Sequence, residues 1–204
     1  MNLIDYKLLE ILETTPEKFP DFEPESIYTP GFCERVNILS QQFHLIMQQI
    51  GMGLSVEPLL NNSPQLKAWV EKVQPIISTP AIAKSWNVSL QKLTNNNLLV
   101  AQYDLIIERE EQLIAIDWSI QARPPSYQQL LESWQTQLRL FLLLENSNFE
   151  PEQIGISYLL VNSKSAPIYH FGYSRQQRER FKQKLEGILS KLPKSEKDVA
   201  STTL

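Results

Sequence analysis

Two aspartates lie inside apolar runs that a short charged segment separates. Residues 98–108 (LLVAQYDLIIE) are mostly aliphatic, residues 109–112 (REEQ) are polar, and residues 113–120 (LIAIDWSI) are apolar again. This pattern predicts two consecutive strands joined by a charged turn, with Asp104 in the first and Asp117 in the second. An aspartate in a buried strand costs free energy unless it is paired or binds a metal ion. The two carboxylates therefore predict a site at which both converge on one cation.

Period-two alternation divides the second predicted strand into two faces. One face carries Ala115, Asp117, Ser119 and Gln121, and the other carries Ile114, Ile116, Trp118 and Ile120. A purely structural role is the alternative for the two aspartates. A strand aspartate can cap a neighbouring backbone group, or it can pair with an arginine such as Arg139.

The two aspartates and their neighbours resemble the core of the PD-(D/E)XK nucleases, in which one acid is followed on the next strand by acid-x-Lys. The RecB-like branch is the most similar, because its second block reads D-[YW]-K-T. Asp104 and Asp117-Trp118 fit this pattern, whereas Ser119 stands in place of the lysine. The resemblance implies that Asp104 and Asp117 bind Mg²⁺ or Mn²⁺, which would activate the water that hydrolyses a phosphodiester.

With the lysine missing, the resemblance implies a degenerate member of that family. In the family the lysine positions the attacking water and stabilises charge in the transition state. Losing a preorganised group of this kind costs on the order of 10²–10³-fold in rate. Ser119 supplies no cation, and Gln121 and Arg123 are the nearby candidates for a substitute.

A histidine on a predicted helix is a third candidate ligand. Residues 33–50 (CERVNILSQQFHLIMQQI) repeat apolar side chains at helical spacing. The segment around His44 resembles the family's G-x-x-FH motif, whose histidine helps to bind the metal, with Gln41 in place of the glycine. The alternative is a histidine that is hydrogen-bonded beside the core or exposed to solvent.

Two glutamines compete for a further role on a helix predicted over residues 126–145. Ser126 is the expected N-cap, and Gln129 completes a capping box. The helix resembles the family's Q-x-x-x-Y motif, in which a glutamine orients the lysine or the DNA. Gln135 matches the family wording WQT, and Gln137 flanks the apolar stripe. An exposed helix glutamine is the alternative for either residue.

The remaining periodicities complete the predicted architecture. Helices are expected over residues 3–13, 64–73 and 82–93 and from Ser174 onward, and an edge hairpin is expected over 154–161 and 167–173. This order predicts an α/β (α+β) sandwich with a central mixed sheet flanked by helices. The resemblance implies a restriction-endonuclease-like core. We expect a single nuclease-like domain over residues 1–193 and a disordered tail over 194–204.

Composition narrows the class of protein and its compartment. The 204 residues are 42% hydrophobic and 21% charged, which fits one soluble domain with a sizeable core. No apolar run reaches the roughly 18 residues of a membrane span, and acids stand where a signal peptide has lysines. We therefore expect a cytoplasmic protein without membrane contact. The single cysteine, Cys33, excludes an internal disulfide.

An iron–sulfur cluster is not expected. The segment LLEILETTPEKF resembles the LLxxCPRKF opening of RecB-like domains, in which a cysteine helps to hold the cluster in some relatives. Here Thr15 takes the place of the cysteine and Glu17 that of the arginine.

The charge pattern leaves the partner open. The net charge of −4 disfavours a dedicated nucleic-acid binder, because phosphate backbones attract basic surfaces. Residues 174–198 hold eight of the nineteen basic residues, which predicts either a DNA-backbone contact or a solvated helix face. His170, on the expected edge strand, has no predicted role.

Two functions follow from these residues. The chain is either a degenerate relative that binds nucleic acid or a protein partner, or an active metal-dependent DNA nuclease with a variant site. Because function is argued from the site and not from the fold, the missing lysine favours the degenerate relative.

Overall fold

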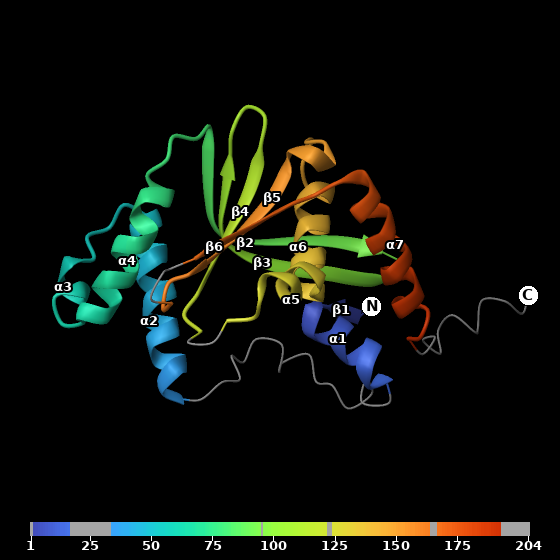
Figure 1. Ribbon diagram of the computed structural model, residues 1–204, viewed down its shortest axis with the longest axis horizontal. Coiled ribbons are helices and arrows are strands. Elements are labelled where there is room, and N and C mark those ends of the chain that lie inside the picture. The colour runs from blue at the N-terminus through green and yellow to red at the C-terminus, as the bar shows by residue number, and fades with distance from the viewer. Residues whose placement is uncertain (1, 17–33, 95, 122–123, 164–166, 193–204) are drawn as a thin grey trace, which may run out of the picture.

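The computed structural model describes residues 2–16, 34–94, 96–121, 124–163 and 167–192 (Figure 1). The predicted tail over 194–204 lies outside the described residues, as do Glu17, Cys33 and Arg123.

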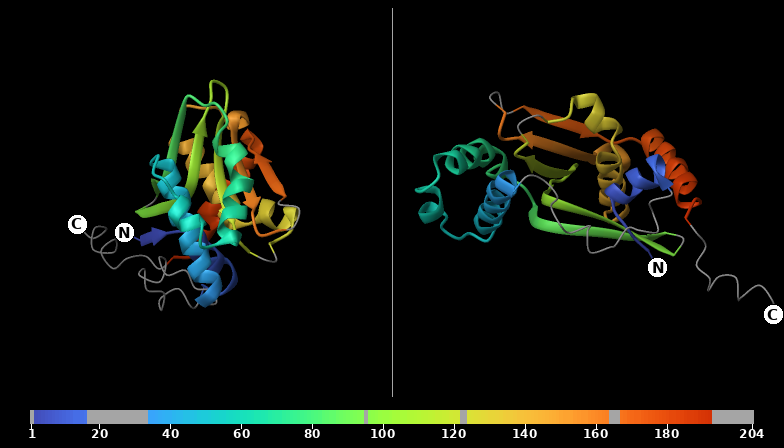
Figure 2. Two further views of the ribbon diagram at one scale, coloured as in Figure 1. Left: turned by 90° about the vertical axis from the view of Figure 1, so that its left-hand side faces the viewer. Right: turned by 90° about the horizontal axis from the view of Figure 1, so that it is seen from below.

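Six strands of the described residues form a mixed sheet that is the middle layer of the molecule (Figures 1 and 2). They are β1 (Asn2–Ile4), β2 (Ala83–Thr94), β3 (Asn97–Glu108), β4 (Leu113–Ser119), β5 (Ile154–Leu160) and β6 (Ile168–Gly172). The order is β1-β3-β4-β5-β6, and β2 pairs with β3. The pairs β1–β3 and β4–β5 are parallel, and the other pairs are antiparallel.

Helices cover both faces of the sheet and enclose two apolar cores (Figures 1 and 2). The first core lies under α1 (Tyr6–Thr14), α5 (Tyr127–Glu132), α6 (Trp134–Glu145) and α7 (Arg175–Leu189). The second lies under α2 (Glu34–Gly51) and α4 (Pro64–Ile77), with the short α3 (Glu57–Leu60) beside α4. The predicted fold class, a central mixed sheet flanked by helices, is confirmed. None of the described helices is long and apolar enough to cross a membrane.

Residues 82–93 form most of strand β2, so the helix predicted there is wrong. Burial alternates between exposed and half-buried at every residue of β2, as a strand requires. The strand pairs with β3 along its whole length, and Asn96, with φ of 63°, lies in the connecting turn. Trp86, Leu90 and Leu93 fit a helical spacing, whereas Trp86, Val88 and Leu90 fit strand alternation. Long-range pairing with β3 decides between the two.

Two other predicted helices are shorter than expected. The helix predicted from residue 3 begins at Tyr6, because Asn2–Ile4 pair with β3 and Asp5 caps the helix by accepting the Leu8 N–H at 2.9 Å. The helix predicted over 126–145 divides at Ser133, whose ψ of 145° is extended. Ser133 caps α6, and the capping box predicted for Ser126 and Gln129 is confirmed.

The edge of β3 that faces β4 opens beside Asp104. β2 covers one edge of β3 from end to end, so β1 and β4 share the other edge. β1 pairs with residues 97–99 and β4 with residues 105–108, so residues 100–104 have no strand partner there among the described residues. The last β3–β4 pair is Leu105 with Ile116, after which the two strands diverge. This fork leaves room for side chains from the helices.

The strands also change cores at the fork. Trp86 packs in the second core, whereas Val88 and Leu90 pack against the first. Between them Asn87 has a φ of 50°, a left-handed conformation that turns the strand. The register places Asn87 opposite Asp104, so this acid lies where the two cores meet.

Candidate active site at the fork between β3 and β4

The fork brings Asp104 and Asp117 together at the end of the β3–β4 ladder. Asp104 precedes the last pair and Asp117 follows it, and each side chain is only 15% exposed. Asp104 Oδ2 accepts the backbone N–H of Trp118 at 3.0 Å, in place of the next ladder bond. Burial, with the neighbouring Asp104 charge, raises the pKa of Asp117 to about 7, although Arg139 opposes this shift. The two carboxylates thus form one buried acidic pair.

His44 holds the first acid of the pair. Its Nδ1 lies 3.0 Å from Asp104 Oδ1 and 3.2 Å from Trp118 Nε1. One ring nitrogen cannot donate to the carboxylate and accept from the indole at once. We place the proton on Nδ1, because a bare lone pair would repel the carboxylate. Burial lowers the pKa of His44, but the hydrogen bond and charge of Asp104 outweigh it and raise that pKa.

Arg139 holds the second acid from the opposite layer. Its Nη1 donates to Asp117 Oδ2 at 2.7 Å, and the arginine side chain is 12% exposed. Tyr103 donates its hydroxyl to the Arg139 carbonyl at 2.6 Å, and the guanidinium carbon lies 5.9 Å from the centre of the Tyr158 ring. Both contacts expected of aspartates with a purely structural role are therefore present. Asp104 accepts a backbone N–H, and Asp117 pairs with an arginine.

Ser119 and Gln121 lie beyond the acidic pair along the chain. Ser119 is the last residue of β4, and its Oγ accepts the Gln121 backbone N–H at 3.2 Å. Gln121 is exposed, and neither side chain bonds to the aspartates within the described part of the chain. Their predicted roles stay predictions.

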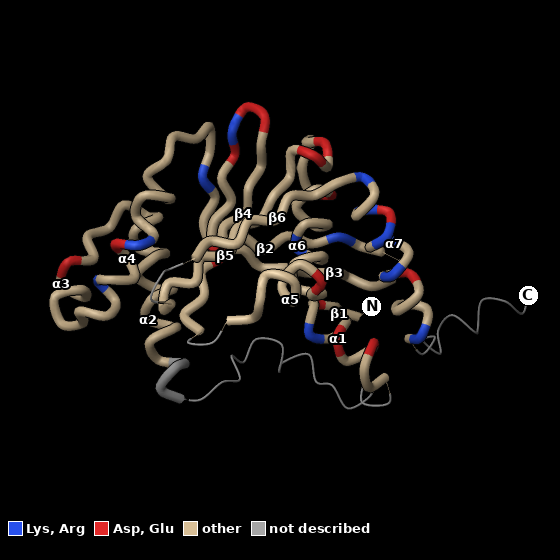
Figure 3. Tube along the Cα trace, in the orientation of Figure 1, with Lys and Arg blue, Asp and Glu red and all other residues tan. Residues whose placement is uncertain are grey.

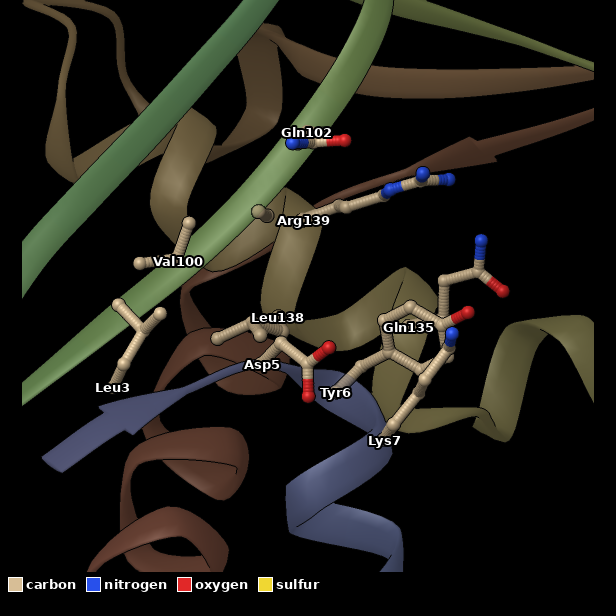
Figure 4. A pocket seen from close by; sticks show the side chains of 10 residues that line it. Leu3, Asp5, Tyr6, Lys7, Val100, Gln102, Gln135, Leu138 and Arg139 are labelled. Carbon is tan, nitrogen blue, oxygen red and sulfur yellow. The ribbon is translucent and has the colours of Figure 1, made fainter. Parts of the chain in front are cut away.

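The structure separates the two candidate glutamines. Gln135 lines a cavity of about 200 Å³ beside Arg139, whereas Gln137 Nε2 donates to the Glu132 carbonyl at 3.2 Å. The cavity is lined by Leu3, Asp5, Tyr6, Lys7, Val100, Ala101, Gln102, Gln135, Leu138 and Arg139. Figure 4 shows the polar ends of Tyr6, Lys7 and Gln135 gathered at one side of this cavity. Gln135 therefore shares a cavity with Arg139, the partner of Asp117, whereas Gln137 makes a local contact on its own helix.

Sequence reasoning missed the contribution of the N-terminus to the cavity beside Arg139. Tyr6 and Lys7 reach the cavity because β1 pairs with the start of β3, 95 residues later. No local spacing signals that pairing. His170, by contrast, lies on β6, where its Nδ1 bonds to the Ser157 hydroxyl at 2.9 Å.

A family model described as "PD-(D/E)XK nuclease superfamily" matches residues 41–202, which include His44, both aspartates and Arg139. The chain belongs to the PD-(D/E)XK nuclease superfamily. No curated protein matches it.

Two solved structures resemble this superfamily member. A protein from Eubacterium rectale named "Putative exonuclease" is 6% identical with a TM-score of 0.52, over 94% of this chain and 83% of that one. The crystal structure of SSO0001 is 13% identical with a TM-score of 0.46, over 96% of this chain and 79% of that one. The likeness to the first shows the fold alone.

Members of the superfamily generally use divalent metal ions, and the residues at this fork do not fit such an ion as they are arranged. Among the described residues, no group of three or more His, Cys, Asp or Glu side chains is placed to hold a metal. Asp117 is bound to the Arg139 guanidinium, and Asp104 is bound to His44. The assignment of His44, Asp104 and Asp117 as ligands stays a prediction.

Proposed function

We propose that this PD-(D/E)XK superfamily member is a degenerate RecB-like protein that binds nucleic acid and has lost efficient phosphodiester hydrolysis. The observation that carries the proposal is the buried ion pair between Arg139 and Asp117. It engages one of the two acids that the chemistry needs, at a site where Ser119 already replaces the lysine.

Hydrolysis at this site would need groups that the fork does not offer. The attacking water must be activated, and charge that develops on the phosphate must be stabilised. Ser119 supplies a hydroxyl without charge, and its Oγ already accepts the Gln121 backbone N–H. The Gln121 side chain is exposed and carries no charge either. Both deficits lower the rate, so we expect cleavage that is weak or absent.

The cavity beside Arg139 supplies donors suited to a phosphate backbone, although the Asp5 carboxylate also lines it. Lys7, Gln102 and Gln135 line it together with Arg139. Lysine and amide side chains are common contacts of phosphate oxygens, and such contacts position a nucleic acid without reading its sequence. Binding at this cavity is compatible with an acidic protein because it needs only a local basic group.

Helix α7 supports the proposal less well than the cavity does. Figure 3 shows its basic residues interspersed with acidic ones. Arg175 pairs with Glu150 at 2.9 Å, Arg178 with Glu145 at 2.6 Å, and Lys184 with Glu13 at 3.1 Å. These internal ion pairs compete with phosphate for the same cations, which favours the solvated-face alternative for this helix.

Binding is tested by fluorescence anisotropy with labelled single-stranded and duplex DNA at several salt concentrations. We expect Lys7→Ala to weaken binding several-fold and to lower the salt slope by about 1, because it removes one phosphate contact. Gln135→Ala should also weaken binding, whereas the control Gln137→Ala should not. Wild-type protein that binds neither single-stranded nor duplex DNA at low salt would contradict the proposal and favour a protein partner.

A second function is favoured by the same arginine. Arg139 places a cation beside Asp117, so it could stand in for the missing lysine in an active, Mg²⁺- or Mn²⁺-dependent DNA nuclease. In that case wild-type protein cleaves DNA with added metal, and Arg139→Met abolishes cleavage while metal and DNA still bind. The two functions therefore differ in whether the unaltered site binds a metal ion.

A further inference from the structure

We infer that the Arg139 guanidinium takes the place of a divalent cation at the Asp104–Asp117 pair, so that the site binds no Mg²⁺ or Mn²⁺ until this side chain is removed. The inference rests on the proposed function, in which the site is inactive, and it attributes that inactivity to Arg139.

Both acids at the fork already have a partner without a metal ion. Asp104 lies against His44 and Asp117 against Arg139, at 3.0 and 2.7 Å. Arginine carries a permanent positive charge, and buried carboxylates are stable only beside a cation or hydrogen-bond donors. A divalent ion entering between the acids would meet the guanidinium at close range and be repelled.

Arg139 is built into the core and cannot easily swing aside. Its neighbours Leu138 and Leu140 on α6 are buried, and its own backbone carbonyl accepts the Tyr103 hydroxyl. The guanidinium faces the Tyr158 ring, whose hydroxyl bonds in turn to Thr136 Oγ1 at 3.0 Å. Moving away from Asp117 would break this buried ion pair, and separating the partners of such a pair is strongly destabilising.

The oxygens that Arg139 engages are of the kind that Mg²⁺ and Mn²⁺ prefer. Both ions select carboxylate and water ligands, and Asp117 Oδ2 becomes available once the guanidinium is gone. Methionine is unbranched and apolar, so Arg139→Met fills part of the vacated volume without supplying a charge. The variant would leave a carboxylate pair without its cation, which attracts a divalent ion.

The test measures Mn²⁺ binding by electron paramagnetic resonance of the free ion, in wild-type protein, Arg139→Met and Arg139→Met/Asp117→Asn. We expect Arg139→Met to bind one Mn²⁺ at least ten-fold more tightly than wild type, and the double variant to lose that gain. Arg139→Lys, which keeps a positive charge, is the matched control and should bind no better than wild type. Circular dichroism and thermal unfolding confirm that each variant is folded, and Arg139→Gln replaces any Arg139→Met protein that is not.

Two results would overturn the inference. One is Mn²⁺ binding by wild-type protein that Asp117→Asn abolishes, and the other is a folded Arg139→Met or Arg139→Gln variant that gains no Mn²⁺ affinity. These failures are separate from failure of the proposed function. Wild-type protein that binds Mn²⁺ and DNA without cleaving the DNA contradicts only the inference, whereas a gain of Mn²⁺ binding in a protein that binds no nucleic acid contradicts only the proposed function.

Discussion

Each acid at the fork has a partner that was visible in the sequence to a different degree. Asp104 and Asp117 stand out because they interrupt apolar runs, and His44 stands out through the motif around it. The sequence named Arg139 only as an example of an arginine that could pair with an aspartate, because α6 must dock on the sheet before the Arg139 and Asp117 side chains meet. Lys7 had no signal at all. The sequence therefore identified the candidate residues, but which of them pair with one another depends on the fold.

A buried hydroxyl gives a stability test at the residue scale. The Tyr173 hydroxyl is buried and has no hydrogen-bond partner among the described residues, and burial raises its pKa. Because an unsatisfied buried donor costs free energy, Tyr173→Phe should raise the free energy of unfolding by about 1 kcal/mol. Urea denaturation measures it. Tyr158→Phe, which removes a bonded hydroxyl, is the control and should lower stability; a similar loss in Tyr173→Phe would show that its hydroxyl is bonded.

At the scale of elements, local sequence patterns predicted correctly those helices and strands whose conformation follows from the spacing of their own side chains. The alternation of β4 is confirmed: Ala115 packs in the first core, and Ile116, Trp118 and Ile120 pack in the second. The caps at Ser126 and the helices α2, α4 and α7 likewise follow from local signals. β1 was missed because three residues carry too little local signal and only pairing with β3 makes them a strand. β2 was predicted wrongly because its residues fit both a helical spacing and alternation, and only pairing with β3 decides between them.

The turn of β2 opposite Asp104 can be tested with a matched pair of variants. Asn87 has a φ of 50°, which costs about 1–2 kcal/mol for an L residue with an ordinary side chain and little for glycine. We expect Asn87→Ala to lower the free energy of unfolding by about 1 kcal/mol, and Asn87→Gly to leave it within a few tenths. Chemical denaturation of both proteins separates the two outcomes. Equal stability of the two variants would mean that β2 does not need a left-handed residue at this position.

At the scale of the whole molecule, the resemblance carried by the two acids was enough to give the superfamily and the fold class. The composition agreed with a globular protein. It could not show which basic side chains are free to bind a ligand and which are already paired with acidic side chains. Most basic residues of α7 are engaged with acids from other elements, and this follows from packing and not from charge spacing.

One of these contacts makes stability depend on pH. Glu145 on α6 bonds to Lys92 of β2 and to Arg178 of α7, at 2.6 Å for the latter, so it joins three elements. Burial raises the pKa of Glu145, but the hydrogen bonds from Lys92 and Arg178 outweigh it and hold the pKa below its ordinary value of 4.5. A lowered folded pKa contributes stability above the unfolded value and loses it as the pH falls through the folded value.

Glu145→Gln isolates this contribution from those of the other carboxyl groups. We expect the variant to be about 1–3 kcal/mol less stable than wild type at neutral pH, because it loses hydrogen bonds to charged groups. The difference should shrink as the pH falls below 4.5, where Glu145 itself becomes protonated. Urea denaturation across this range measures it, and a difference that stays constant with pH would contradict the assignment.

The central claim is that a nuclease fold here lacks nuclease chemistry because Arg139 holds Asp117. The most direct measurement is a cleavage assay on labelled single-stranded and duplex DNA with Mg²⁺ or Mn²⁺, in which wild-type protein is run beside Asp117→Asn. We predict that wild-type protein binds DNA and that its cleavage does not exceed that of the variant. Metal-dependent cleavage by wild type that Asp117→Asn abolishes would contradict the claim.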